Sequence, residues 1–437
     1  MRKDERNMPA KTISRKKKYR RFLFVLLTAN IIGIFVYGSY TVKYKIPDEL
    51  RVRVGYESRF DLDLPLVAKT YVKDQSVISV DQKPLSKNEL TLDLSSPFSV
   101  NLSRQGSYEV NLQFLGMTLK KIQVQAIEDH RVMPVGAPVG IYIHTDGVMV
   151  LGTGRITDSY GMACEPAKGI IKSGDYIRAI DGVEVFSAAD MARVISECDG
   201  TALEFDVIRE GQPLMLQILP VMDVSGTYKA GIWIRDDTQG IGTLSYIDEN
   251  HQFAALGHGI TDIDTGLLIQ IDGGGLYPSR IHSIIKGAGG KPGEMVGTIY
   301  YGENNCQGTI LKNTDTGIFG RLDQTSCWQY DDSQAVDVGL KQDLHVGDAT
   351  IRCCVDGQIQ DYDIKISSID YNSHDSNKDF IIEITDPRLL ALTNGIIQGM
   401  SGSPILQDGR MVGAVTHVFL NDPTRGYGIF IENMLEH

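Results

Sequence analysis

The sequence lacks the ligand spacing of a metal site. Its 437 residues contain six cysteines, and these form no C-x-x-C pair and no Cys/His ligand pattern, which are the usual signatures of structural zinc. We therefore expect no metal and no cofactor. The sequence is compatible with one or two disulfides and equally with buried free thiols. The six cysteines are Cys164, Cys198, Cys306, Cys327, Cys353 and Cys354.

The body of the chain is poor in positive charge. Residues 1–21 hold ten Lys and Arg against two acidic residues, a balance of +8, and the whole chain carries −12, so residues 22–437 carry −20. Nucleic-acid binding depends on Lys and Arg that neutralise phosphates. The acidity of the body therefore argues against a nucleic-acid partner.

A run without charge, FLFVLLTANIIGIFVYGSYTV, occupies residues 22–42. As a helix with a rise of about 1.5 Å per residue it would cross roughly 30 Å of hydrocarbon. A cleaved signal peptide is the alternative, but its apolar part usually has about 7–15 residues, and Gly38 and Ser39 make a poor cleavage site. We predict an uncleaved transmembrane signal anchor, with the basic residues 1–21 in the cytoplasm and everything beyond residue 45 outside it.

Two regions of short strands follow the predicted anchor. Residues 46–130 contain alternating apolar runs separated by turn signals, and the last run reads as a hairpin that turns near Gly116. This pattern predicts a small β domain without an evident chemical site. From Gly231 to His437, short strands and Gly-containing turns recur with few helical patterns, which predicts a pair of small antiparallel barrels and a mainly β chain.

The segment between them, 134–222, contains the block GIIKSGDYIRAIDGVEV at 169–185. Gly174 in this block can adopt a backbone conformation closed to other residues, and Asp175 can hydrogen-bond the local backbone. The order of strands, turn and helix resembles a PDZ domain, an α+β fold. The resemblance implies that a peptide adds as a strand in a groove, and the predicted groove residues are Val139, Gly140, Ile141, Tyr142 and Ile143.

Near the C-terminus the chain reads GMSGSP, with Ser401 between Gly399 and Gly402. A serine hydroxyl becomes a nucleophile only when a base takes its proton and N–H groups hold the oxyanion. The motif resembles the G-x-S-G-x-P nucleophile motif of chymotrypsin-like peptidases, which is likewise followed by a hairpin. We predict Ser401 as the nucleophile and the amides of Gly399 and Ser401 as the oxyanion hole, while Ser403 has a structural role.

His258 is the predicted base, since it ends an apolar strand between Gly257 and Gly259. His417 is its rival, but the chymotrypsin-like resemblance assigns the strand of Thr416, His417 and Val418 to contacts with the substrate backbone. The acid that fixes the imidazole tautomer is predicted at Asp386, which follows the apolar strand FIIEIT and precedes a proline.

Asp262 and Asp264 remain alternatives for the acid, although their D-I-D-T-G context looks like an Asx-turn. Met400 stands before the nucleophile, where chymotrypsin-like enzymes have an Asp that pairs with a newly formed N-terminus. That activation switch is therefore excluded, and the PDZ-like segment is the predicted regulator.

The whole arrangement resembles a narrower family, the stage IV sporulation protein B (SpoIVB) peptidases. The resemblance rests on the anchor, the PDZ-like segment and the blocks ALGHGITD, TDPRLL, GIIQGMSGSPI and AVTHVFLNDPTRGYGI. It implies a His258/Asp386/Ser401 triad in a serine endopeptidase exported between forespore and mother cell. Such an enzyme cuts itself and a membrane-bound regulatory protein, which leads to activation of a late sigma factor. The alternative is a catalytically silent PDZ-type adaptor that only binds peptides.

Overall fold

The computed structural model describes residues 10–60, 67–71, 78–80, 83–84, 89–114, 117–373 and 377–436. The chain is mainly β, as the sequence predicts. It divides into two compact units, the first made of Met1–Glu128 with Asp370–Asn372 and the second of Asp129–Ile369 with Ser373–His437. Each unit is described by itself below.

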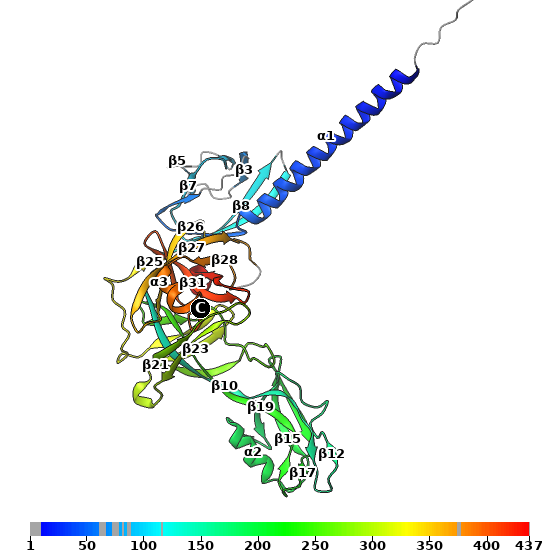
Figure 1. The fold of residues 1–437 in the computed structure, drawn as a ribbon, viewed down its shortest axis with the longest axis vertical. Helices are drawn as coiled ribbons and strands as arrows, with labels where there is room; N and C mark the ends of the chain where they lie inside the picture. Colours follow the sequence, from blue (N-terminus) through cyan, green and yellow to red (C-terminus); the bar gives the residue numbers. More distant parts are fainter. Residues whose placement is uncertain are drawn as a thin grey trace, which may run out of the picture. The chain divides into compact units, whose positions relative to one another are not determined.

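The first unit begins with the uninterrupted helix α1, Ala10–Lys45 (Figure 1). Its stretch Lys16–Gly38 has a mean hydropathy of 1.8 and is long and apolar enough to cross a membrane. Two polar side chains within the stretch bond to carbonyls of their own helix: Thr28 Oγ1 donates to Phe24 O at 2.6 Å and Asn30 Nδ2 to Leu26 O at 2.8 Å.

Two sheets complete the described part of this unit. The five-stranded sheet has the order β1 (Glu49–Arg53), β9 (Met117–Ile127), β8 (Gly106–Phe114), β3 (Val67–Tyr71) and β6 (Glu89–Asp93). The second sheet has the order β2 (Glu57–Phe60), β7 (Phe98–Leu102), β4 (Ile78–Val80) and β5 (Lys83–Pro84). Their shared core includes Val52, Phe60 and Leu102, together with Val42 of α1 and Ile46, which directly follows this helix.

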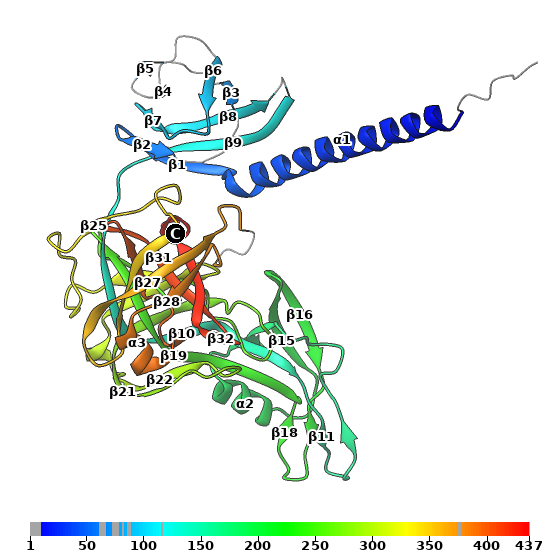
Figure 2. The ribbon, with the colours of Figure 1, turned by 45° about the horizontal axis from the view of Figure 1, so that its top comes forward.

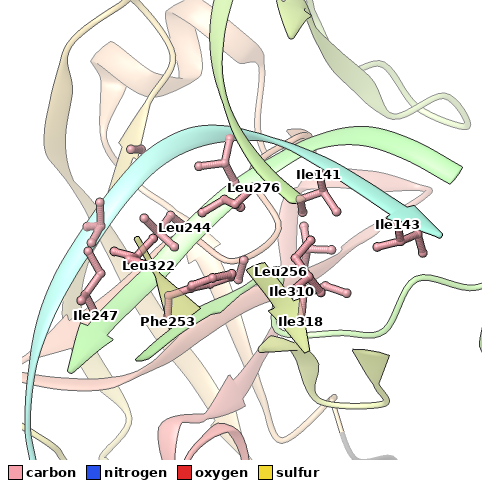
Figure 3. Packing of buried hydrophobic residues seen from close by; sticks show 14 of the residues in the cluster. Ile141, Ile143, Leu244, Ile247, Phe253, Leu256, Leu276, Ile310, Ile318 and Leu322 are labelled. Carbon is pink, nitrogen blue, oxygen red and sulfur yellow. The ribbon is translucent and has the colours of Figure 1, made fainter. Parts of the chain in front are cut away.

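In the second unit, strand pairings close a six-membered ring that forms a first barrel. The ring runs through β10 (Arg131–Thr153), β19 (Ile232–Asp248), β20 (Gln252–Ala255), β24 (Gly317–Leu322), β23 (Gly308–Thr314) and β21 (Ile271–Ile285), which pairs again with β10. Buried aliphatic side chains from these strands and Phe253 fill its interior (Figure 3). Strand β22 (Gly293–Ile299) pairs with β21, and β25 (Val336–Asp337) pairs with β10.

A second barrel is closed by β26, β27, β28, β32, β31 and β30 in that order. The helix α3, Pro387–Thr393, follows β28, and α4, Ile431–Met434, ends the fold. The short strand β29, Ile397–Gln398, pairs in parallel with β22 and leads into the loop of Ser401. The barrel strands are β26 (Gly347–Cys354), β27 (Ile359–Ile369), β28 (Phe380–Ile384), β30 (Pro404–Gln407), β31 (Arg410–Phe419) and β32 (Asp422–Phe430).

A separate lobe of the second unit carries α2, Ala188–Ser196. The lobe has its own buried core, made by α2 and by the sheet strands β13 (Tyr176–Ile180), β15 (Leu203–Arg209) and β16 (Gln212–Ile218). As expected from the sequence, Gly174 has a φ of +86° and the Asp175 carboxylate accepts the Lys172 N–H at 2.8 Å. The remaining short elements are β11 (Ile156–Thr157), β12 (Ala163–Cys164), β14 (Val183–Glu184), β17 (Val221–Met222), β18 (Tyr228–Lys229) and the 3₁₀ turn Glu303–Asn305.

Strands β10 and β19 pass from the first barrel into this lobe as one antiparallel pair (Figure 2). The first part of β10, through Ile143, belongs to the barrel core, whereas Val148 and Val150 belong to the core of the lobe. The predicted boundary at residue 134 falls within β10, whose residues from Val135 to Ile143 contribute to the barrel core. The predicted peptidase segment from residue 231 includes Ile232 and Ile234, which pack against the core of the lobe.

Candidate active site

A cavity of about 640 Å³ is lined by residues of both barrels. His258 comes from the turn after β20, and Ser401 comes from the loop between β29 and β30. The predicted substrate residues Thr416, His417 and Val418 line the same cavity. The structure thus brings together the predicted nucleophile, the predicted base and the predicted substrate strand.

The loop of Ser401 depends on two glycines with left-handed backbones. Gly399 has a φ of +101° and Gly402 a φ of +93°, which side chains strongly disfavour. A Cβ on Gly402 would lie only 2.3 Å from the Thr243 carbonyl oxygen. The Ser401 hydroxyl donates to the Thr416 carbonyl at 2.8 Å, so in this state its proton is not shared with His258.

The His258 ring has a defined tautomer. Its Nδ1 lies 2.9 Å from the Gly259 carbonyl oxygen, and because a carbonyl only accepts, Nδ1 carries the proton and Nε2 keeps its lone pair. Burial lowers the pKa of His258, although the Gly259 bond opposes this. The ring centre of His417 lies 5.0 Å away. A neutral imidazole with a lone pair on Nε2 is the form that a general base requires.

Two N–H groups flank the nucleophile in the predicted oxyanion hole. Among the hydrogen bonds of the described residues, none uses the N–H of Gly399 or of Ser401. The N–H groups of their neighbours are engaged, since Met400 donates to Ile397 O at 3.1 Å and Gly402 donates to Val415 O at 2.7 Å. The Gly399 and Ser401 amides are therefore the available donors of this loop.

The structure does not place Asp386 beside His258. Asp386 is the N-cap of α3, and its carboxylate accepts the Arg388 N–H at 2.8 Å and the Arg388 Nη2 at 2.7 Å. Hydrogen bonds from the Arg388 side chain hold the pKa of Asp386 down at about 2, against the effect of burial. Asp386 is not part of the cavity lining, and the tautomer of His258 is fixed by the Gly259 carbonyl instead.

The two alternative acids are engaged elsewhere as well. The Asp262 carboxylate accepts the N–H groups of Asp264 and Thr265 at 3.0 and 2.8 Å, which is the Asx-turn that the sequence suggested. Arg235 forms ion pairs with Asp262 at 2.5 Å and with Asp264 at 2.8 Å. Neither aspartate lines the cavity.

The predicted peptide groove at residues 139–143 is wrong. This part of β10 pairs with β19 along one edge and with β21 along the other, so no edge remains for an added strand. Val139, Ile141 and Ile143 are buried in the barrel core, and Gly140 and Tyr142 lie between them on the same strand. The segment is a barrel wall.

A different groove, of about 360 Å³, lies beside α2. Its walls are Ala188, Met191, Ala192 and Ile195 of α2 and the stretch 227–234, which ends in the first residues of β19. The strand pairings of this fully described lobe leave the edge of β19 that faces away from β10 unpaired at residues 232–234. Sequence reasoning missed this groove, because it placed the peptide on the wrong strand.

All six cysteines are free thiols in the structure. Among the described residues no group of three or more His, Cys, Asp or Glu side chains is arranged to hold a metal ion.

The comparison with protein families decides the class of this site. Residues 226–435 match the model of the SpoIVB peptidase S55 family. This region belongs to the SpoIVB peptidase family. It is therefore a serine peptidase of a sporulation family, and the matched residues include His258 and Ser401. A search of curated proteins gave no match.

Proposed function

We propose that this SpoIVB-family chain is a membrane-anchored serine endopeptidase in which Ser401 is the nucleophile and His258 the general base. The observation that carries the proposal is that both side chains line one cavity within the matched family region. The Gly259 carbonyl fixes the base tautomer, and the amides of Gly399 and Ser401 supply the oxyanion hole.

The reaction begins with rotation of the Ser401 hydroxyl away from the Thr416 carbonyl and toward Nε2 of His258. As Oγ bonds to the scissile carbonyl carbon, its proton passes to Nε2, and the carbonyl oxygen gains negative charge that the two amides stabilise. His258 then gives that proton to the leaving amine as the C–N bond breaks. Water, activated by the same imidazole, hydrolyses the acyl-enzyme and restores Ser401.

The substrate lies extended along β31. This strand pairs with β30 only as far as Ala414, and the next part, Thr416 to Val418, lines the cavity. An extended peptide can add to such a strand through main-chain hydrogen bonds. The cavity surface is mostly apolar, with Ile241, Ile396 and Leu420 among its walls, so we expect apolar side chains next to the cut bond.

The helix α1 anchors the enzyme. Its apolar stretch Lys16–Gly38 follows a basic N-terminus, so the positive-inside rule puts residues 1–21 in the cytoplasm of the forespore and the catalytic body in the intermembrane space. There the enzyme cuts a membrane-bound regulatory protein and itself, which leads to activation of a late sigma factor.

The lobe with α2 acts as a PDZ-type peptide-binding domain. A peptide adds to the unpaired edge of β19 at residues 232–234 and packs its side chains against Met191 and Ile195 of α2, both groove residues.

Peptides selected by phage display on the full-length Ser401→Ala protein test this assignment. Ala192→Trp, which fills the groove, should abolish their binding, whereas the neighbouring exposed Arg193→Trp should not. Equal binding by both variants would contradict the groove.

The catalytic assignment is tested with the full-length chain in detergent micelles, acting on itself and on a membrane-bound substrate. Ser401→Ala and His258→Ala should each lose at least about a thousandfold in kcat/KM. Ser403→Ala is the matched control, because the Ser403 hydroxyl is buried and makes no hydrogen bond within the described residues. Undiminished cleavage by Ser401→Ala would remove the nucleophile assignment, whereas absence of cleavage by the wild type would favour the adaptor.

A further inference from the structure

Thr243, on β19 of the first barrel, is only 2% exposed and bonds directly to the nucleophile loop of the second barrel. Its hydroxyl donates to the Gly399 carbonyl at 2.7 Å, and its N–H donates to the Ser401 carbonyl at 3.1 Å. Among the described residues, no other side chain hydrogen-bonds to a carbonyl of residues 399–401.

These bonds fix the orientation of the peptide planes around the nucleophile. The plane between Gly399 and Met400 is held at both ends, by Thr243 Oγ1 at its carbonyl and by Ile397 O at its N–H. The plane after Ser401 is held in the same way, by the Thr243 N–H and by Val415 O. Because a peptide plane is rigid and its C=O and N–H point in opposite directions, fixing the two neighbouring planes also fixes the Ser401 N–H.

Thr243 also contacts the segment that leads to the base. Its carbonyl accepts the Leu256 N–H at 3.3 Å, two residues before His258. The close approach depends on Gly402, since any Cβ there would overlap the Thr243 carbonyl oxygen. One buried residue therefore contacts both segments that carry the proposed catalytic groups.

We propose that Thr243 is a positioning residue, whose hydroxyl holds the peptide plane after Gly399 and thereby keeps the Ser401 amide in the geometry that receives the oxyanion. The inference rests on the proposed peptidase function and names a residue that acts on the same site without touching the substrate. Its effect falls on the transition state, because only there does the substrate oxygen carry the charge that the amides stabilise.

The test compares three full-length variants in detergent micelles, with a peptide substrate and a peptide boronic acid, which forms a tetrahedral adduct with the serine. Thr243→Val keeps the shape of the side chain and removes the hydroxyl. Loss of a whole oxyanion donor lowers kcat by about 10²–10³, so displacement of a donor should lower kcat by about tenfold to a hundredfold. KM should change less than about threefold, and the affinity for the boronic acid should fall by the same factor as kcat.

Two controls separate positioning from general packing. Thr243→Ser retains the hydroxyl and should recover kcat to within about threefold of wild type. Ser245→Ala removes a buried hydroxyl two residues along the same strand, one without a hydrogen bond in the described residues, and should leave kcat and boronic acid affinity unchanged. If Thr243→Val does not fold, Thr243→Ala is measured in its place.

Three results would overturn the proposal. They are a Thr243→Val enzyme with wild-type kcat, a loss that appears in KM alone, and failure of both hydroxyl-free variants to fold, which would make the role one of folding. A wild-type rate in Ser401→Ala would instead reject the proposed function, so the two failures can be told apart.

Discussion

The hydroxyl of Ser401 donates to the carbonyl of Thr416, 2.8 Å away, and both residues line the cavity that also contains His258. A serine hydroxyl has one proton, so this bond and a bond to the imidazole exclude each other. The described state is therefore one in which the proposed nucleophile donates to the proposed substrate strand. In the proposed mechanism, the hydroxyl rotates from this carbonyl toward the imidazole of His258.

The pH dependence of cleavage should reflect the burial of His258. Burial lowers its pKa below the ordinary 6.5, and the base is active only when neutral. We expect kcat/KM to rise with pH to a plateau, with the midpoint of the acid limb below pH 6.5. With a peptide substrate that has no ionisable groups, the pH dependence reflects the enzyme alone. A midpoint above pH 6.5 would contradict the buried, neutral imidazole.

Asp386 should matter more for stability than for the chemical step. Asp386→Asn keeps an N-cap side chain but loses the ion pair with Arg388. We expect a lower melting temperature and, at temperatures where the variant is folded, a loss in kcat/KM of less than about tenfold, against roughly 10⁴ for an acid that orients the base. Arg388→Met is the matched control, which removes the same ion pair and keeps the carboxylate.

The pKa of Asp386 sets the pH window of its contribution. The pKa of about 2 in the folded state lies below the ordinary 3.8, so the stabilisation is fully present above pH 4 and is lost as the pH falls toward 2. The melting temperatures of wild type and Asp386→Asn should therefore converge in that window. A constant difference would contradict the ion pair as the source of stability.

Asp379 should make the fold less stable as the pH rises. Burial raises its pKa to about 7, against the opposing hydrogen bonds from Phe430 N and Asn433 Nδ2 at 2.7 and 2.8 Å. The folded state thus keeps a proton that the unfolded state releases above pH 3.8, so the free energy of unfolding decreases between about pH 4 and 7 and then levels. Asp379→Asn, which can accept both hydrogen bonds, should flatten the melting temperature over this range and raise it at pH 8; an unchanged slope would refute the assignment.

Gly402 should tolerate no side chain. Besides the strain of its φ of +93°, a Cβ would meet Thr243 O at 2.3 Å and Leu256 N at 2.5 Å. We expect Gly402→Ala to lose at least about a hundredfold in kcat, since the loop must move away from β19. Gly409→Ala is the control: its φ is +75° but nothing lies within 4 Å, so it should cost only about 1 kcal/mol in stability. Similar activity in both variants would show that the loop does not need its contact with β19.

The sequence predicted the centre of the site because local signals mark it. Glycines flank both His258 and Ser401, and the structure uses them, with Gly257 and Gly402 in left-handed conformations. The substrate role of Thr416 to Val418 was predicted from the chymotrypsin-like resemblance, and these residues line the same cavity as His258 and Ser401. Thr243 carried no signal, since a threonine in a β-strand is ordinary and its partners in the nucleophile loop lie more than 150 residues away.

Two predicted site features differ from the arrangement in the structure for physical reasons. Residues 139–143 have the alternation of a half-buried strand, but which edges are paired depends on β19 and β21, which are remote in sequence. For Asp386 a local signal was present. Asp followed by Pro387, an apolar turn and Asn394-Gly395 is the pattern of a short capped helix, and it indicates the N-cap role that the structure assigns.

The strand β19 lines the groove beside α2 at residues 232–234, lines the catalytic cavity at residues 238–241 and bonds to the nucleophile loop at Thr243. None of its residues, all of which the structure describes, has a positive φ, and the eleven steps from Ile232 to Thr243 span about 36 Å. An extended backbone can hardly lengthen, so a peptide that pulled on the groove end would transmit its displacement along the chain itself. Communication between ligand and catalytic centre would then need no hinge, only a small axial translation of one strand.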